Sequence, residues 1–365
     1  MRSRSTPGRI RAAHACGLAS TRDLPGPLAS LSRLALLLAL AAAPAAAQPD
    51  LTPAPSRGPT EIRDAHLLAQ PRLTLPALSP HTTRRGAWDF QVSALWANSF
   101  SWVQDVAGEE PKTRRFLIDG EALVLDARLR RGLTHNLDVG VRVPVQGRNG
   151  GTLDDFIDWW HRVAHLPDGD RPFFRQDAFR VEGLTTDGTA FSWNDQTGFG
   201  LGDVEIDARW RVRDGARSSA SVAVVARASL PTGTGPFDGN GAGGGAQLVL
   251  GAPLSPSFDL YAGAGLTAQD PGPVRGVLYE PARAHGFLAL EWRPWQRLSL
   301  VAETNAASRL VENIDGYPGL HWIVNVTGRL DIGRRTRLDL GFTENLLSQL
   351  TTTDFALYVG FGIRP

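Results

Sequence analysis

The sequence predicts an antiparallel transmembrane β-barrel of about twelve strands, with one short amphipathic helix in a long extracellular loop. Apolar residues alternate with polar or small ones in segment after segment between Trp88 and Ile363. The connections between these segments are alternately short and long. No segment after the N-terminal region approaches the roughly 18 continuous apolar residues of a membrane helix. Together these patterns are typical of a bacterial outer-membrane barrel.

The N-terminal segment 1–47 has the features of an export signal. Arg33 precedes the apolar run Leu34 to Leu40, and Ala45-Ala46-Ala47 provides a cleavage site before Gln48. The single cysteine, Cys16, lies upstream of this site, so the mature chain is expected to contain no thiol. We therefore expect export and insertion into the cell outer membrane.

Residues 48–86 are rich in Pro, Thr and Arg and predict an extended periplasmic arm that precedes the barrel at 87–365. Two interpretations of this arm stay open. It is either a loose tether or a segment that plugs the lumen of the barrel.

Twelve segments have the alternation of a strand. They cover residues 87–98, 115–129, 136–146, 200–213, 218–230, 242–251, 257–267, 285–293, 297–306, 320–332, 336–346 and 354–363. In the last of these, Phe355, Leu357, Val359, Phe361 and Ile363 occupy every second position. Successive strand side chains point to opposite faces, so one face of this strand is apolar and the other small or polar.

The connections provide an independent test of this topology. If the N-terminus is periplasmic, every second connection should be a short turn. The connections 130–135, 214–217, 252–256, 294–296 and 333–335 are all short, whereas most of the others are longer. Trp88, Trp96, Trp210, Trp292, Trp295 and Trp322 lie near strand ends, where an aromatic girdle would meet the lipid headgroups.

Charged residues at inward positions are the best clue to function. Between 203 and 211 every second residue is ionisable, and a packed soluble core could hardly bury five such charges. A water-filled lumen accommodates them easily. Fourteen residues are predicted to line the lumen: Asp126, Arg128, Arg142, Asp203, Glu205, Asp207, Arg209, Arg211, Arg227, Glu291, Glu303, Arg329, Asp339 and Glu344. Both signs occur, so they either tune the selectivity of an open pore or pair across the barrel and close it.

The long excursion 147–199 interrupts the barrel pattern. Helical spacing of apolar residues predicts a helix at 152–166, with Thr152 able to cap it. The excursion either folds on itself and rims the barrel, folds into the lumen as a lid, or forms an outer binding surface. In the lid interpretation the gate consists of Phe156, Ile157, Trp160 and His161.

Metal binding is not expected in this excursion. His161 and His165 have the i, i+4 spacing of zinc ligands, but the stretch lacks the Glu of the H-E-x-x-H motif and no third ligand is evident. The sequence contains no motif that points to a cofactor.

Several stretches resemble a family of uncharacterised Gram-negative proteins, domain-of-unknown-function family 3187. They are Gly150-Gly151-Thr152-Leu153-Asp154 with Phe156-Ile157 and His161, then Leu166-Pro167, Gly200-Leu201-Gly202-Asp203, Leu230-Pro231-Thr232-Gly233 and Phe342-Thr343-Glu344-Asn345. The resemblance implies an outer-membrane barrel and brings no assigned activity. The chain ends Phe361-Gly362-Ile363-Arg364-Pro365, without the terminal aromatic residue usual in such barrels.

The leading functional hypothesis is a channel or binding barrel for a small polar or amphipathic solute. The alternative is a structural or surface-interaction barrel with an occluded lumen. A membrane-embedded hydrolase is a second alternative and would require Ser308, His285 or His321 to cluster with an acidic or amide partner; otherwise no enzymatic activity is expected. The expected partners are outer-membrane lipid, the β-barrel assembly machinery and a small solute. The net charge of +1 argues against nucleic acid.

Overall fold

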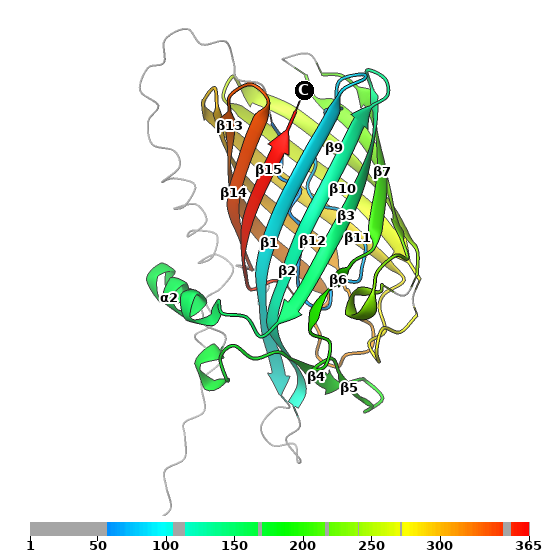
Figure 1. Cartoon of the computed structure of the whole chain (residues 1–365), viewed down its shortest axis with the longest axis vertical. Helices are drawn as coiled ribbons and strands as arrows, with labels where there is room; N and C mark the ends of the chain where they lie inside the picture. The colour runs from blue at the N-terminus through cyan, green and yellow to red at the C-terminus, as the bar shows by residue number, and fades with distance from the viewer. Residues whose placement is uncertain are drawn as a thin grey trace, which may run out of the picture. The chain divides into compact units, whose positions relative to one another are not determined.

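The computed structural model describes residues 57–104, 114–166, 170–215, 219–239, 241–270, 272–345 and 352–364 (Figure 1). The expected export signal and the first part of the arm, residues 48–56, lie outside the described residues. No helix in the described ranges is both long and apolar enough to cross a bilayer.

Twelve antiparallel strands form a closed ring. Each strand pairs with the next one along the chain, and β1 closes the ring by pairing with β15. The ring contains β1 (Trp88–Gln104), β2 (Arg114–Gly132), β3 (Leu137–Asn149), β7 (Val204–Arg213), β8 (Ser221–Leu230), β9 (Gly243–Ser255), β10 (Phe258–Gln269), β11 (Ala282–Trp295), β12 (Leu298–Ser308), β13 (Leu320–Ile332), β14 (Thr336–Glu344) and β15 (Phe355–Ile363). The predicted twelve-stranded barrel is confirmed.

Side chains alternate between the two faces of the wall as the sequence predicts. In β15, Ala356 and Tyr358 are buried inside the barrel, whereas Leu357, Val359 and Phe361 are each at least 37% exposed on the outside. The outer face of a transmembrane barrel contacts lipid, and this outward apolar row is of the kind that such a face requires.

Short turns and long loops occupy opposite ends of the barrel. Two-residue turns join β9 to β10 and β11 to β12, whereas the excursion between β3 and β7 spans residues 150–203. The β13–β14 turn contains Gly333 with a φ of 76°, a left-handed conformation that glycine adopts without strain. We name the two ends the turn end and the loop end. In Figure 1 the turn end is at the top, where the C-terminus is marked.

The excursion between β3 and β7 is structured. It contains α2 (Asp154–Ala164), the 3₁₀ turn η1 (Arg171–Phe173), β4 (Arg180–Leu184), β5 (Ala190–Ser192) and β6 (Gly198–Leu201), and a second 3₁₀ turn, η2 (Gly235–Phe237), follows β8. At the loop end, β4 pairs with β2, β5 with β4, and β6 with β3.

The predicted helix is confirmed, but the predicted cap is not. Thr152 makes no side-chain cap; instead, Glu121 of β2 accepts backbone hydrogen bonds from Thr152 (2.8 Å) and Leu153 (2.5 Å). A carboxylate from the barrel wall therefore satisfies amides at the start of α2, where the helix dipole favours negative charge.

Candidate functional site

The N-terminal arm lies inside the barrel. Near its start, the Arg57 guanidinium donates to Asp331 and to the Gln296 carbonyl at the turn end. Further along, Tyr279 donates a hydrogen bond to the Leu68 carbonyl (2.9 Å). Arg85 then returns to the turn end and forms a β-bridge with Gly132. For residues 57–86 the structure therefore corrects the loose-tether interpretation in favour of a plug, and the plug has the path of a hairpin.

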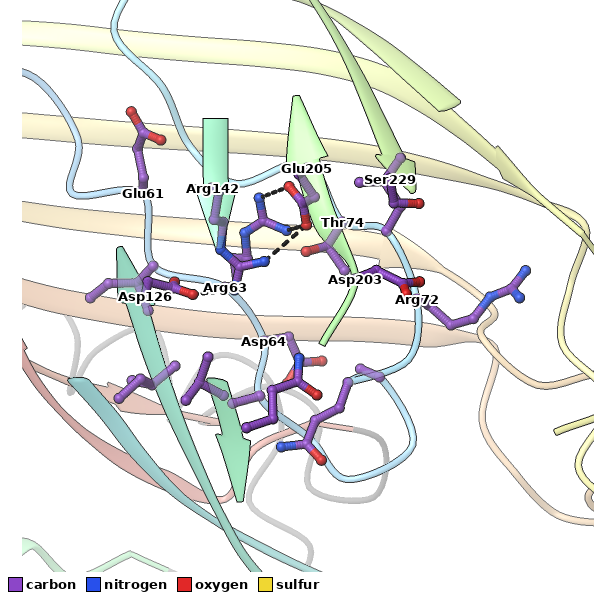
Figure 2. A pocket seen from close by; sticks show the side chains of 18 of the residues that line it. Glu61, Arg63, Asp64, Arg72, Thr74, Asp126, Arg142, Asp203, Glu205 and Ser229 are labelled. Atoms are coloured by element: carbon purple, nitrogen blue, oxygen red, sulfur yellow. Dashed lines mark hydrogen bonds and ion pairs between the residues drawn. The ribbon is translucent and has the colours of Figure 1, made fainter. Parts of the chain in front are cut away.

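The limb that runs from Arg57 at the turn end to Leu68 at the loop end is held by ion pairs, and we name it the ascending limb. Arg63 donates from both terminal nitrogens to the two oxygens of Glu205, each at 2.5 Å. Arg142 and Arg227 of the wall also reach this carboxylate, at 2.9 and 3.4 Å. Figure 2 shows Arg63 and Arg142 converging on Glu205. We name these four residues the Glu205 cluster, and its geometry joins arm to wall through charge-assisted hydrogen bonds.

Two further acidic groups anchor the ascending limb. Glu61 accepts a hydrogen bond from Arg128 at 3.0 Å. Asp64 accepts one from the Thr353 hydroxyl at 2.9 Å and lies 3.4 Å from the His321 ring. Burial lowers the pKa of the neighbouring His66 to about 4, so that ring is neutral at neutral pH.

The limb that returns from Leu68 to Arg85 at the turn end is named the descending limb. It is held by hydrogen bonds in which one partner is a backbone group. Arg72 donates to the Asp270 carbonyl (2.9 Å), and the Leu73 amide donates to Gln269 (2.8 Å). Nearer the turn end, Arg209 of β7 donates to the carbonyls of Ser79 and His81, both at 2.8 Å. The wall thus supplies partners for an irregular backbone that could not otherwise be buried without cost.

An apolar cluster closes the loop end around the apex of the arm, Leu67 and Leu68. Leu67 and Leu68 pack into a cluster that also contains Trp193, Tyr279 and Tyr317, all nearly fully buried. Trp193 comes from the segment after β5, Tyr279 from the loop between β10 and β11, and Tyr317 from the loop between β12 and β13. The lumen is therefore capped by the arm apex and these loops.

The predicted lumen residues fall almost entirely on the inner face. Twelve of the fourteen occupy inward positions in their strands, and Asp203 continues the inward row of β7 just before that strand begins. Many pair across the wall, as Arg142 does with Asp126 (2.6 Å) and Glu205 (2.9 Å).

Glu344 is the exception. It shares the outward row of β14 with Leu340 and Phe342, and the Trp160 indole donates to it at 2.6 Å. Its prediction as a lumen residue is wrong, because an even number of positions separates it from outward-facing Leu340.

The cavities beside the arm are small except at the turn end. Two spaces next to the ascending limb measure about 50 and 40 Å³, enough for only a few water molecules. A larger cavity of about 480 Å³ lies at the turn end, beside the two ends of the arm hairpin. In this state the arm occupies most of the path through the barrel.

Helix α2 packs on the outer wall of the barrel. Ile157 is fully buried in a cluster with Leu153 and Phe355, and Phe355 is an outward residue of β15. The rings of Phe156 and Trp160 also contact Phe355. Figure 1 shows α2 to one side of the strands. The interpretation of Phe156, Ile157, Trp160 and His161 as a gate over the lumen is therefore corrected: their apolar stripe covers the outside of the wall.

Buried Arg171 ties the excursion to the outer wall. It donates to Asp154 (2.6 Å), to Asn98 of β1 (2.8 Å) and to Asp354, which precedes β15. Substitution Arg171→Ala is expected to free α2, because it leaves two buried carboxylates without their cation at a cost of about 3 kcal/mol. Chymotrypsin should then cleave the excursion faster, while the barrel stays folded.

The matched control for this prediction is Arg175→Ala, because Arg175 is exposed in the same excursion. Equal cleavage rates in the two variants would show that Arg171 does not hold the excursion.

The residues of the hydrolase hypothesis do not form a Ser-His pair, although His321 lies beside Asp64. His285 and His321 point into the lumen, where His285 contacts the Thr267 hydroxyl at 2.9 Å. Ser308 lies in the outward row of β12 and accepts a hydrogen bond from the Ala284 amide at 3.0 Å. His161 and His165 also diverge, since His161 is buried and His165 is exposed beyond the end of α2.

Sequence reasoning missed the arm residues and also Arg130, because the second strand was predicted to end at residue 129 and β2 continues to Gly132. Glu61, Arg63 and Asp64 are absent from the predicted lumen set, yet they make its central contacts. The local sequence does contain an indication: charged and apolar residues mix at 61–69, in contrast to the Pro-rich stretches on either side.

These features define a transmembrane β-barrel whose lumen holds a segment of its own chain. The sequence belongs to the family described as Protein of unknown function (DUF3187), whose model matches residues 35–364. Among curated proteins, no sequence matches the chain.

Solved structures with a similar fold include outer-membrane proteins. The COG4313 outer membrane channel from Pseudomonas putida F1 is 11% identical, with a TM-score of 0.53 over 80% of this chain and 100% of that one. The NanC porin is 8% identical (TM-score 0.42; 76% and 100% covered). The P. putida toluene transporter TodX is 12% identical (TM-score 0.37; 77% and 90% covered). At this identity the first of these similarities shows the barrel fold alone.

Proposed function

We propose that this protein is an outer-membrane channel for a small polar solute, closed by its own N-terminal arm. One observation carries the proposal. Both ends of the arm hairpin lie at the turn end, so the arm can leave the lumen through that end without threading past the barrel wall. In the usual orientation of such barrels the turn end faces the periplasm. The solved outer-membrane channel with the same fold supports this class of function.

The chemistry of the contacts also supports a displaceable arm. The arm meets the wall through ion pairs and hydrogen bonds on both limbs, and its apolar contacts concentrate between Ile62 and Ala69 and at Ala77–Leu78. Buried ion pairs add little net stability compared with apolar packing. A wall that is polar opposite the arm is also a wall that tolerates water once the arm has gone.

A permanently filled structural barrel is the second candidate. The small spaces beside the arm and the pairing of charges across the lumen favour it. The two candidates differ in one measurable respect: only in a channel does arm movement change the flux of solute.

A reversible lock tests the proposal directly. The hydroxyls of Thr60 in the arm and Thr327 in β13 lie 3.2 Å apart. The double variant Thr60→Cys/Thr327→Cys can therefore form a disulfide that fixes the arm to the wall. Since Cys16 is the only native cysteine and precedes the expected cleavage site, no other thiol competes. We expect the reduced variant to admit small sugars and amino acids into proteoliposomes, and the oxidised variant to reduce uptake to the protein-free rate.

The single variant Thr327→Cys is the control and should not respond to oxidation. Uptake that is equal in the oxidised and reduced double variant would show that the arm is not the gate. Absence of uptake in both states would support the permanently filled barrel.

A further inference from the structure

We propose that the cavity at the turn end binds a small multivalent anion through its carboxylate or phosphate groups. This cavity of about 480 Å³ lies between the base of the arm and the strands around it, and we name it the arginine vestibule. Twelve arginines of the described chain contribute to its lining. Its volume falls in the range of about 300–1,000 Å³ typical of small-molecule sites.

Positive charge exceeds negative charge in the vestibule even when the carboxylates that pair with its arginines from outside the lining are counted. Four carboxylates contribute to the lining: Glu61, Asp89, Asp207 and Asp331. Four more pair with the lining arginines from behind them: Asp126, Asp138, Glu205 and Asp339. Twelve guanidinium groups thus face eight carboxylates. A cavity with low-dielectric walls concentrates the resulting positive potential and attracts anions.

Several of these guanidinium groups have donors to spare. In the described part of the chain, the side chains of Arg84, Arg334 and Arg335 at the rim form no ion pair. Deeper inside, Arg337 is 3% exposed and donates to Gln91 at 3.1 Å, but its Nη1 has no partner among the described residues. Arginine presents a planar fork of donors that matches carboxylate and phosphate oxygens. The rim and the interior together therefore offer donors to an anion with more than one charged group.

Phospholipid headgroups are another source of the same anionic chemistry. The exposed rim arginines lie at one end of the barrel, where they could meet headgroup phosphates. Arg337 is buried inside the barrel, on the inward row of β14, so a headgroup in the bilayer does not reach it. Dependence on Arg337 therefore distinguishes a free anion in the vestibule from a lipid at its rim.

Calorimetric titration of the folded full-length protein, in zwitterionic detergent, tests the proposal with citrate and inorganic phosphate as probes. We expect citrate to bind more tightly than phosphate and binding to weaken as salt is added. The triple variant Arg84→Gln/Arg334→Gln/Arg335→Gln should weaken citrate binding by about tenfold, since each partly exposed pair contributes modestly. Arg337→Lys, which keeps the charge but loses the fork of donors, should weaken it as well.

The matched control is Arg162→Gln/Arg175→Gln/Arg309→Gln, which removes the same charge from exposed arginines outside the vestibule. Absence of citrate binding by the unmodified protein, or equal weakening in both triple variants, would overturn the proposal. In nanodiscs, loss of phosphatidylglycerol binding in the rim variant, together with no citrate binding, would assign the arginines to lipid and overturn it too. Because the titration requires no arm movement, its result is independent of whether the barrel opens as a channel.

Discussion

A variant that lacks residues 57–80 is expected to conduct ions in discrete steps, whereas the full chain is expected to stay closed for most of a recording. The deletion removes both limbs of the arm hairpin and leaves the twelve strands, whose pairing does not involve those residues. The widened path is lined by the inward side chains of the wall, which are largely polar or charged. Single-channel recording in a planar bilayer measures the difference.

The open variant should also prefer anions. Loss of residues 57–80 removes acidic Glu61 and Asp64 together with Arg57, Arg63 and Arg72. Of the groups counted in the arginine vestibule it removes one arginine and one carboxylate, so eleven arginines and seven carboxylates remain around the path. With a potassium chloride gradient across the bilayer, the reversal potential should therefore have the same sign as the equilibrium potential of chloride. A deletion variant that is folded by circular dichroism but silent would show that wall side chains fill the lumen without the arm.

The barrel itself could be predicted because its pattern is local. The period of two in Leu357, Val359 and Phe361, and the contrast between short turns and long loops, can be read from adjacent residues. Even the error at Glu344 could have been avoided. Asp339 and Glu344 are five residues apart, an odd number, so in a regular strand their side chains point to opposite faces.

The plug could not be predicted because it depends on contacts between distant residues. Arg63 and Glu205 are separated by 142 positions in the chain. A Pro-rich arm has the same composition whether it lies inside the barrel or outside it. Similarly, the apolar stripe of α2 predicted a buried face, but a lid over the lumen and a helix on the outer wall both require one.

Neutralising Glu205 should release the arm without unfolding the barrel. In Glu205→Gln the carboxylate shared by Arg63, Arg142 and Arg227 is lost. Among the described residues, only Arg142 of these three then keeps an ion pair with another carboxylate, Asp126 at 2.6 Å. Removing one partner of a buried ion pair costs on the order of 3 kcal/mol. Arg142 and Arg227 belong to the wall and stay in place. The uncompensated buried positive charge is therefore reduced when Arg63 leaves the lumen together with the arm. An energy of about 3 kcal/mol corresponds to roughly a hundredfold rise in the ratio of open to closed channels.

Two comparisons separate this specific effect from general loosening of the barrel. Asp259→Asn breaks a buried ion pair with Arg293 that joins β10 to β11, so it should leave the open probability unchanged. In an Arg63→Gln background, Glu205→Gln should add little, because the two residues act through one shared contact. If instead Glu205→Gln and Asp259→Asn change the open probability equally, the Glu205 cluster does not hold the arm. A released arm should also expose Arg57, Arg63 and Arg72 to trypsin, which gives a readout of arm position that does not depend on conductance.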